Sequence, residues 1–169
     1  MSSSPPLVLT FAASDPTGGA GLQADLLTLA ALGCHPLSVV TALTVQDTRG
    51  VASIDAVDAA LVERQAAALL AELKVAAFKL GVLGSEANAR AVAAIVASHP
   101  RVPLVVDPVL ASGRGEPLAS DALIATLLEF VMPRATLATP NSLEARRLGG
   151  ARALLDRGCR YVLITGTHE

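Results

Sequence analysis

Two acidic residues have types and positions in this sequence that could do chemistry. Asp107 directly follows the apolar run at residues 103–106, and Glu144 lies one helical turn after Asn141, in a helix expected at residues 142–148. Their carboxylates are hard oxygen ligands of the kind that organise Mg²⁺, usually through water, where phosphates are present. The sequence has no serine nucleophile elbow, no His-Glu-x-x-His motif and no zinc-ligand spacing. These residues therefore indicate a metal and phosphate site.

A glycine-rich segment, Gly18-Gly19-Ala20-Gly21, is the second candidate for chemistry. It separates a strand expected at residues 7–13 from a helix expected at residues 22–32. Such a turn exposes backbone N–H groups beside a positive helix end, which suits a phosphate or another small polar ligand. No Gly-Lys-Ser/Thr follows, and the glycine spacing is not that of dinucleotide-binding loops. A glycine-rich turn alone is more often structural than functional. A functional role for this turn therefore depends on whether other polar residues lie beside it in the fold.

Polar residues follow the other expected strands as well, and ligands bind beyond the carboxyl ends of the strands in open parallel sheets. The candidates at these ends are Gln46, Asp107, Asn141, Glu144, Thr165 and His168. Each also has a structural explanation. Asn141 could cap its helix with Glu144 completing a capping box, and Gln46 could satisfy backbone groups. A functional explanation is favoured for the set as a whole, because all of these residues are expected at one edge of one sheet. Val82 and Val109 beside Gln46 could form a flat pocket for a heteroaromatic ring.

The elements that must position these residues alternate between strand and helix. The expected strands are residues 7–13, 38–45, 76–80, 103–106, 135–138 and 161–164. The expected helices are residues 22–32, 56–73, 85–98, 120–131, 142–148 and 151–157. Apolar strands separated by helices predict a mostly parallel sheet covered on both faces, hence a doubly wound three-layer α/β/α sandwich. Residues 1–169 are expected to form one domain.

Composition limits the classes of partner. Hydrophobic residues make up 52% of the chain but aromatic residues only 2%, so the core must be built from Ala, Val and Leu. A net charge of −2 and the lack of a basic stripe argue against nucleic acid. The uncharged stretch 26–46 is broken by Gly33 and Pro36, so a helix and a strand explain it better than a membrane span. Two isolated cysteines and no signal peptide indicate a cytoplasmic protein with reduced thiols.

Together these motifs resemble those of the hydroxymethylpyrimidine/phosphomethylpyrimidine kinase family of thiamine biosynthesis, within the ribokinase-like superfamily. The matching segments are residues 14–26, 41–51, 79–83 and 106–109, and Thr139-Pro140-Asn141 with Glu144. They occur in family order along essentially the whole chain, and the first two together are highly specific. The resemblance implies ATP- and Mg²⁺-dependent phosphorylation of 4-amino-5-hydroxymethyl-2-methylpyrimidine and then of its monophosphate.

The resemblance also implies roles for particular residues. Gln46 would bind the aminopyrimidine, with Val82 and Val109 against the ring, and Gly18 and Gly19 would approach the hydroxymethyl side. Asp25 lies in the same motif as a further substrate-site residue without a defined role. Asp107 and Glu144 would belong to the Mg²⁺ and phosphate network, while Asn141 and Thr165 would lie towards the ATP phosphates. Family members are commonly homodimers, so the same state is expected here.

The sequence departs from the family in two places. Family members continue beyond the strand at residues 161–164 into a Gly-x-Gly-Cys turn, which forms an anion hole and carries the catalytic-base position. No such turn occurs here, and Cys34 and Cys159 do not match it, so no catalytic residue is assigned. If the 169-residue chain is complete, we expect it to be catalytically inactive. Gly149 and Gly150 also join two expected helices where the family has a longer segment, which suggests a deleted loop.

Two alternatives stay open from the sequence. One is a pyridoxine or pyridoxal kinase of the same superfamily, although Gln46 within Val45-Gln46-Asp47-Thr48 favours the pyrimidine. The other is a non-catalytic pyrimidine-binding protein.

Overall fold

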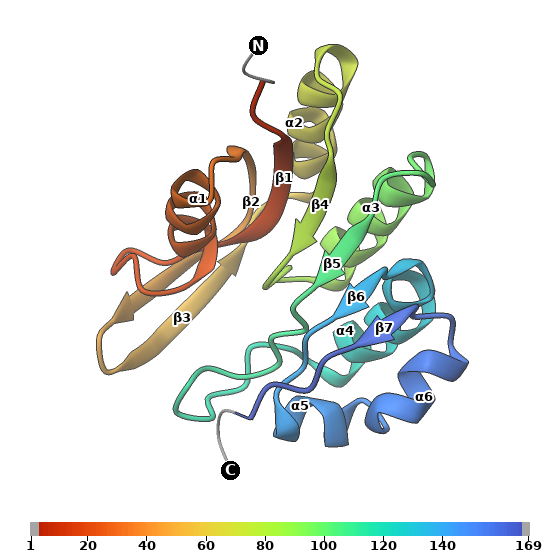
Figure 1. Ribbon diagram of the computed structural model, residues 1–169. Helices are drawn as coiled ribbons and strands as arrows, with labels where there is room; N and C mark the ends of the chain where they lie inside the picture. Colours follow the sequence, from red (N-terminus) through yellow and green to blue (C-terminus); the bar gives the residue numbers. More distant parts are fainter. Residues whose placement is uncertain (1–3, 167–169) are drawn as a thin grey trace.

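A seven-stranded sheet organises the molecule, and the computed structural model describes it through residues 4–166. The strand order is β3-β2-β1-β4-β5-β6-β7 (Figure 1). The strands are β1 Leu7–Ser14, β2 His35–Asp47, β3 Gly50–Ala56, β4 Ala77–Leu80, β5 Leu104–Val106, β6 Leu137–Ala138 and β7 Tyr161–Val162. Neighbouring strands are parallel except β2 and β3, which form an antiparallel hairpin. The mostly parallel α/β sheet expected from the sequence is confirmed.

Helices cover both faces of this sheet. They are α1 Gly21–Ala31, α2 Ala59–Glu72, α3 Glu86–Ala97, α4 Asp121–Thr126, α5 Ser142–Arg147 and α6 Gly150–Asp156. Side chains alternate between the faces of a strand, and on β1 the Thr10 hydroxyl bonds to Asp25 of α1 whereas Phe11 points into the core on the other face. Helices α2 and α3 pack on that second face. The uncharged stretch 26–46 is the end of α1 followed by β2, as expected, and no helix within the described range is long and apolar enough to cross a membrane.

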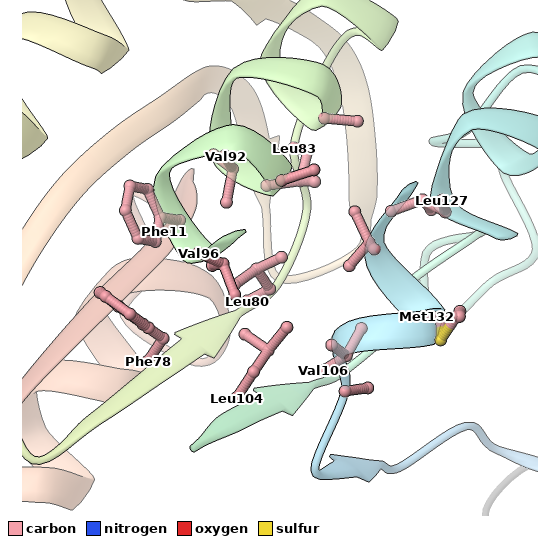
Figure 2. Packing of buried hydrophobic residues seen from close by; sticks show 14 of the residues in the cluster. Phe11, Phe78, Leu80, Leu83, Val92, Val96, Leu104, Val106, Leu127 and Met132 are labelled. Carbon is pink, nitrogen blue, oxygen red and sulfur yellow. The ribbon is translucent and has the colours of Figure 1, made fainter. Parts of the chain in front are cut away.

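The main core lies between the sheet and α3, and small and branched side chains fill it. Figure 2 shows labelled residues of this core from β1, β4, β5 and α3, namely Phe11, Phe78, Leu80, Leu104, Val106, Val92 and Val96. The rings of Phe11 and Phe78 pack at a centroid distance of 6.2 Å and are two of the few aromatic rings in the chain. Apolar contacts thus bury one face of these strands, whereas the Thr10 hydroxyl and the Lys79 ammonium meet Asp25 of α1 on the other face.

Three sequence expectations about local structure were wrong. The helix expected from residue 56 begins only at Ala59, capped by Asp58, because residues 50–56 form strand β3 instead. The Asp47 carboxylate accepts hydrogen bonds from the backbone N–H groups of Arg49 and Gly50 and so holds the two-residue hairpin turn. The helix expected at residues 120–131 changes after Thr126 into π-helical and then 3₁₀ turns, which end at Arg134. Cys159 is a buried free thiol as expected, but Cys34 is partly exposed.

A buried asparagine ties three segments together behind the cavity described below. Ser85 caps α3 by accepting a hydrogen bond from the backbone N–H of Asn88, but the Asn88 side chain does not complete a capping box. Its side chain is fully buried, and Nδ2 lies 2.9, 3.1 and 3.0 Å from the carbonyl oxygens of Thr41, Val57 and Leu83. The Thr41 hydroxyl also donates to the carbonyl of Val82. These bonds fix the loop after β4 against β2 and the end of β3.

We expect Asn88→Ala to lower the free energy of unfolding by about 2 kcal/mol, because buried carbonyls then lose their donor. Urea unfolding followed by circular dichroism measures the change. Ala94→Gln, a substitution at an exposed position of the same helix, is the control and should change stability by less than about 0.5 kcal/mol, because both residues are good helix formers. Equal effects of the two substitutions would contradict the role assigned to Asn88.

Candidate functional site

A cavity of about 330 Å³ lies at the carboxyl ends of β1, β2, β4 and β5; we call it the first cavity. The β2–β3 hairpin, the glycine-rich turn and the segments after β4 and β5 form its walls. Its larger apolar lining residues are Val51, Ile54, Val82, Val109 and Leu118. Gln46 and Asp107 contribute polar groups to the same space. The structure therefore brings Gln46, Val82, Val109, Asp25 and Asp107 together, as the sequence predicted for the edge of the sheet.

Gln46 lies within the long strand β2 rather than in a loop beyond it. The Thr44 hydroxyl, two residues earlier on the same side of the strand, lies 2.8 Å from the Ser14 carbonyl oxygen and 3.3 Å from Gln46 Oε1. The Thr44 hydroxyl has one hydrogen, and its nearer acceptor is the Ser14 carbonyl oxygen, so Thr44 ties β2 to the end of β1 and lies beside the Gln46 amide. The Gln46 amide can therefore donate from its NH₂ group and accept at its oxygen toward a ligand in the cavity.

The glycine-rich turn is organised by Asp15 and not by an outside anion. The Asp15 side chain is buried, and its carboxylate accepts bonds from the backbone N–H groups of Thr17 and Ala20, both at 2.8 Å. The expectation that this turn offers N–H groups to a phosphate is corrected for these two groups, because the Asp15 carboxylate already occupies them. Ala20 and Gly21 line the first cavity, whereas Gly18 and Gly19 do not.

Asp25 and Lys79 form an ion pair in the floor of the first cavity. Asp25 Oδ2 lies 2.9 Å from Lys79 Nζ and accepts a hydrogen bond from the Thr10 hydroxyl at 2.7 Å. The sequence pointed to Asp25 but assigned no role to Lys79. The signal that could have found it is a lone charged residue between Phe78 and Leu80 in an otherwise apolar strand.

Asp107 lies on the wall between the first cavity and a neighbouring one of about 340 Å³, which we call the second cavity. The second cavity is lined by Asp107, Val109, Ala111, Gly113, Thr139, Asn141, Glu144 and Thr165. Burial raises the pKa of Asp107, and the negative charges of Glu144 and Asp25 raise it further, whereas the ammonium of Lys79 opposes the rise. Its surroundings therefore disfavour the charged form of Asp107, and a nearby cation or a bound proton would stabilise this side chain.

Asn141 and Glu144 form the capping box that the sequence offered as their structural explanation. Asn141 Oδ1 accepts from the backbone N–H of Glu144, and Glu144 Oε2 accepts from that of Asn141, both at 2.9 Å. Glu144 Oε1 accepts from the backbone N–H of Leu110 at 3.1 Å. Both carboxylate oxygens of Glu144 therefore bond to backbone, although the residue also lines the second cavity.

These residues fit a Mg²⁺ ion held largely by phosphates and water. Within residues 4–166 no group of three or more His, Cys, Asp or Glu side chains could enclose a metal by itself. Mg²⁺ commonly binds through one or two carboxylates together with substrate phosphates, which suits the buried carboxylate of Asp107 with Glu144 nearby. His168, another strand-end candidate, lies outside the described residues.

The sheet, its helices and the cavities at the strand ends define a ribokinase-like α/β protein, and solved structures of that class share the arrangement. A phosphomethylpyrimidine kinase from Clostridium difficile superposes with a TM-score of 0.88 at 32% identity, over 96% of this chain and 76% of that one. A pyridoxal kinase from Staphylococcus aureus, solved with pyridoxal, gives 0.86 at 28% identity, over 97% and 66%.

The family model for phosphomethylpyrimidine kinase matches residues 15–169, and the chain belongs to this family. The hydroxymethylpyrimidine/phosphomethylpyrimidine kinase of Mycobacterium tuberculosis is 43% identical over 180 aligned positions. That alignment covers 97% of this chain and 64% of the relative, so the chain spans a little under two thirds of the relative's length. Helices α5 and α6 are joined directly through Leu148 and Gly149, where the resemblance implies a longer segment.

Proposed function

We propose that this protein, as one kinase domain, transfers the γ-phosphoryl group of ATP to the hydroxymethyl group of 4-amino-5-hydroxymethyl-2-methylpyrimidine. A second transfer to the resulting monophosphate gives the diphosphate used in thiamine biosynthesis. One observation carries the proposal: Asp107 lines both cavities. The first cavity is largely apolar and contains the amide of Gln46, and the second is polar and lies at the start of α5. Such an arrangement suits a ring-shaped acceptor in one cavity and a phosphate donor in the other.

In the first cavity we assign the pyrimidine to the space between Val82 and Val109. Gln46 would hydrogen-bond the aminopyrimidine edge, since its NH₂ group can donate to a ring nitrogen and its oxygen can accept from an amino group. A site built to hydrogen-bond a polar substrate edge rejects analogues that lack it, because its own polar groups are then left unpaired. Gly18 and Gly19 would act through the shape of the turn that presents Ala20 and Gly21 to the substrate.

In the second cavity we assign the phosphates of ATP to the side lined by Asn141 and Thr165. Mg²⁺ would be held by Asp107, with Glu144 acting through water, and when bound it supplies charge neutralisation of the transferring phosphoryl group. The protein's own part is to position the acceptor hydroxyl and the donor phosphate at Asp107, and to exclude water around them. Phosphoryl transfer needs little more covalent chemistry than this from side chains.

Calorimetric titration of the 169-residue chain tests binding, and an ATP-consumption assay of a chain that carries the Gly-x-Gly-Cys turn tests turnover. We expect the 169-residue chain to bind the hydroxymethylpyrimidine in preference to pyridoxal, and we expect ATP turnover with the pyrimidine only where that turn is present. Preference for pyridoxal would instead support a pyridoxal kinase. Pyrimidine binding without turnover would support a non-catalytic binding protein, and binding of neither compound would overturn the proposal.

Gln46→Ala should weaken pyrimidine binding by about tenfold, the value of one well-placed hydrogen bond in a buried site. Titration of each variant with the pyrimidine measures the dissociation constant. Gln65→Ala on α2 is the matched control, because Gln65 lies outside the first cavity. An unchanged dissociation constant for Gln46→Ala would remove Gln46 from the binding site.

Two further proposals rest on the sequence, because the two isolated cysteines favour the cytoplasm and the family resemblance implies a homodimer. We propose that the protein acts in the cytoplasm and as a homodimer. Light scattering after size-exclusion chromatography tests the second, and a monomer at micromolar concentration would contradict it.

A further inference from the structure

The ion pair between Lys79 and Asp25 holds a cation inside the first cavity. The side chains of Lys79 and Asp25 are 22% and 17% exposed, so the pair is largely removed from solvent but still reaches the cavity. An ammonium group has three N–H donors, and Asp25 is its one hydrogen-bond partner within residues 4–166. Two donors therefore remain for a ligand.

The lack of a side chain at Gly81 leaves room for the Lys79 ammonium group. Gly81 follows Lys79 by two residues, so both belong to the same face of the chain as it leaves β4. A Cβ atom at Gly81 would lie 3.1 Å from Lys79 Nζ and 3.3 Å from the Ala12 Cβ atom. The missing side chain thus leaves the room into which the lysine folds, towards the carboxyl end of the strands. The ammonium consequently faces the cavity and not the open surface of the sheet.

The charges around the first cavity indicate which kind of ligand the Lys79 ammonium group would bind. Asp15, Asp25 and Asp107 are among the residues that line the first cavity, and Lys79 is the one cationic residue among the described lining residues. The Asp15 carboxylate is occupied by N–H groups of the glycine-rich turn, but it still contributes negative charge beside the cavity. A phosphomonoester carries about −1.5 to −2 charges at neutral pH. A neutral alcohol could enter this cavity without electrostatic cost, but a phosphomonoester would be repelled unless a cation met it.

We propose that Lys79 is the phosphate-binding cation of the first cavity and recognises the phosphoryl group of the monophosphate substrate, with Asp25 as the residue that positions its ammonium. This inference rests on the proposed function, because it assumes that the phosphorylated pyrimidine occupies the first cavity. It assigns Lys79 to the monophosphate and not to ATP, since Lys79 lines the first cavity and not the second.

Titration of Lys79→Met with three ligands tests the inference: the hydroxymethylpyrimidine, its monophosphate and ATP. The monophosphate should bind about tenfold to a hundredfold more weakly than to the unaltered chain, as for loss of a hydrogen bond to a charged group. Binding of the unphosphorylated pyrimidine and of ATP should change less than about threefold, which is less than one neutral hydrogen bond contributes. The chain has one other lysine, Lys74, which is exposed, and Lys74→Met is the matched control. Equal losses for the alcohol and the monophosphate, or a loss confined to ATP, would overturn the assignment.

Asp25→Asn separates positioning from simple charge. This variant removes a negative charge beside the phosphate, so charge alone would strengthen monophosphate binding. If Asp25 positions the ammonium, binding should weaken instead, and a gain would overturn that role. Acetylation by acetic anhydride gives a second measurement on the unaltered chain, since the monophosphate should protect Lys79 but not Lys74. An unaltered chain that binds neither pyrimidine would overturn the proposed function itself, whereas binding with unprotected Lys79 would overturn this inference alone.

Discussion

Replacing Gly21 by alanine is expected to lower the free energy of unfolding by about 2–5 kcal/mol, from a left-handed backbone and an overpacked contact. Gly21 has φ +57°, and an added Cβ atom would lie 2.5 Å from the Ala13 carbonyl oxygen and 3.3 Å from the Asp15 Cβ atom. Because the obstacle is the backbone of β1, neither partner can yield without shifting the start of α1. Urea unfolding of the purified variant measures the change.

Two neighbouring glycines separate the causes of this effect. Gly18 also has positive φ, at +75°, but has open space where a Cβ atom would be, so Gly18→Ala should cost only the backbone term, about 1 kcal/mol. Gly19 has neither positive φ nor a contact closer than 3.5 Å, so Gly19→Ala should be nearly neutral. The expected order of destabilisation is Gly21, then Gly18, then Gly19. Equal effects at Gly21 and Gly18 would show that the contact with β1 contributes nothing.

The sheet could be predicted because each buried strand is a short apolar run in the sequence. The meeting of the site residues could be predicted because each of them follows the end of such a run. Phe78, Leu80, Leu104 and Val106 are buried as those runs imply. Gln46 reaches the same cavity as Val82 because parallel strands end at one edge. The hairpin strand β3 was missed, because residues 50–56 have weak alternation and Asp55 resembled a helix cap.

The remaining errors have two causes. The Asp15 carboxylate occupies N–H groups of the glycine-rich turn only two and five residues away, but the sequence alone does not distinguish this turn from one that leaves those groups free. Lys79 was missed because its partner Asp25 is 54 positions away in the sequence. Asn141 and Glu144 were predictable as a capping box because that motif is local, and their proposed second role depends on the cavity that the fold creates around them.

Asp107→Asn is expected to lower the rate of phosphoryl transfer by about a hundredfold to a thousandfold, as for loss of a charged group at a transition state. The amide keeps the size of the side chain but loses the charge that we assign to the Mg²⁺ and phosphate network. The ATP-consumption assay at saturating pyrimidine measures the rate, with each variant made in a chain that carries the Gly-x-Gly-Cys turn. Asp55→Asn, an exposed substitution on β3, is the control and should leave the rate unchanged. A rate for Asp107→Asn within about threefold of the unaltered chain would contradict the assignment, since one lost transition-state contact costs far more.

The same variant should be more stable, a result that needs no turnover to measure. Burial raises the pKa of Asp107 above its usual 3.8, so at a pH between the unfolded and the folded pKa the folded chain binds a proton there that the unfolded chain has released. Stability contributed by this group therefore falls as the pH rises from the unfolded pKa through the folded pKa, and stays low at pH 7. Asp107→Asn removes that loss, so its melting temperature should exceed that of the unaltered chain at pH 7 and approach it near pH 4. A variant less stable at pH 7 would mean that the Asp107 carboxylate is paired within the folded chain. A lower rate together with a higher melting temperature would mark Asp107 as a residue placed for its charge at the expense of stability.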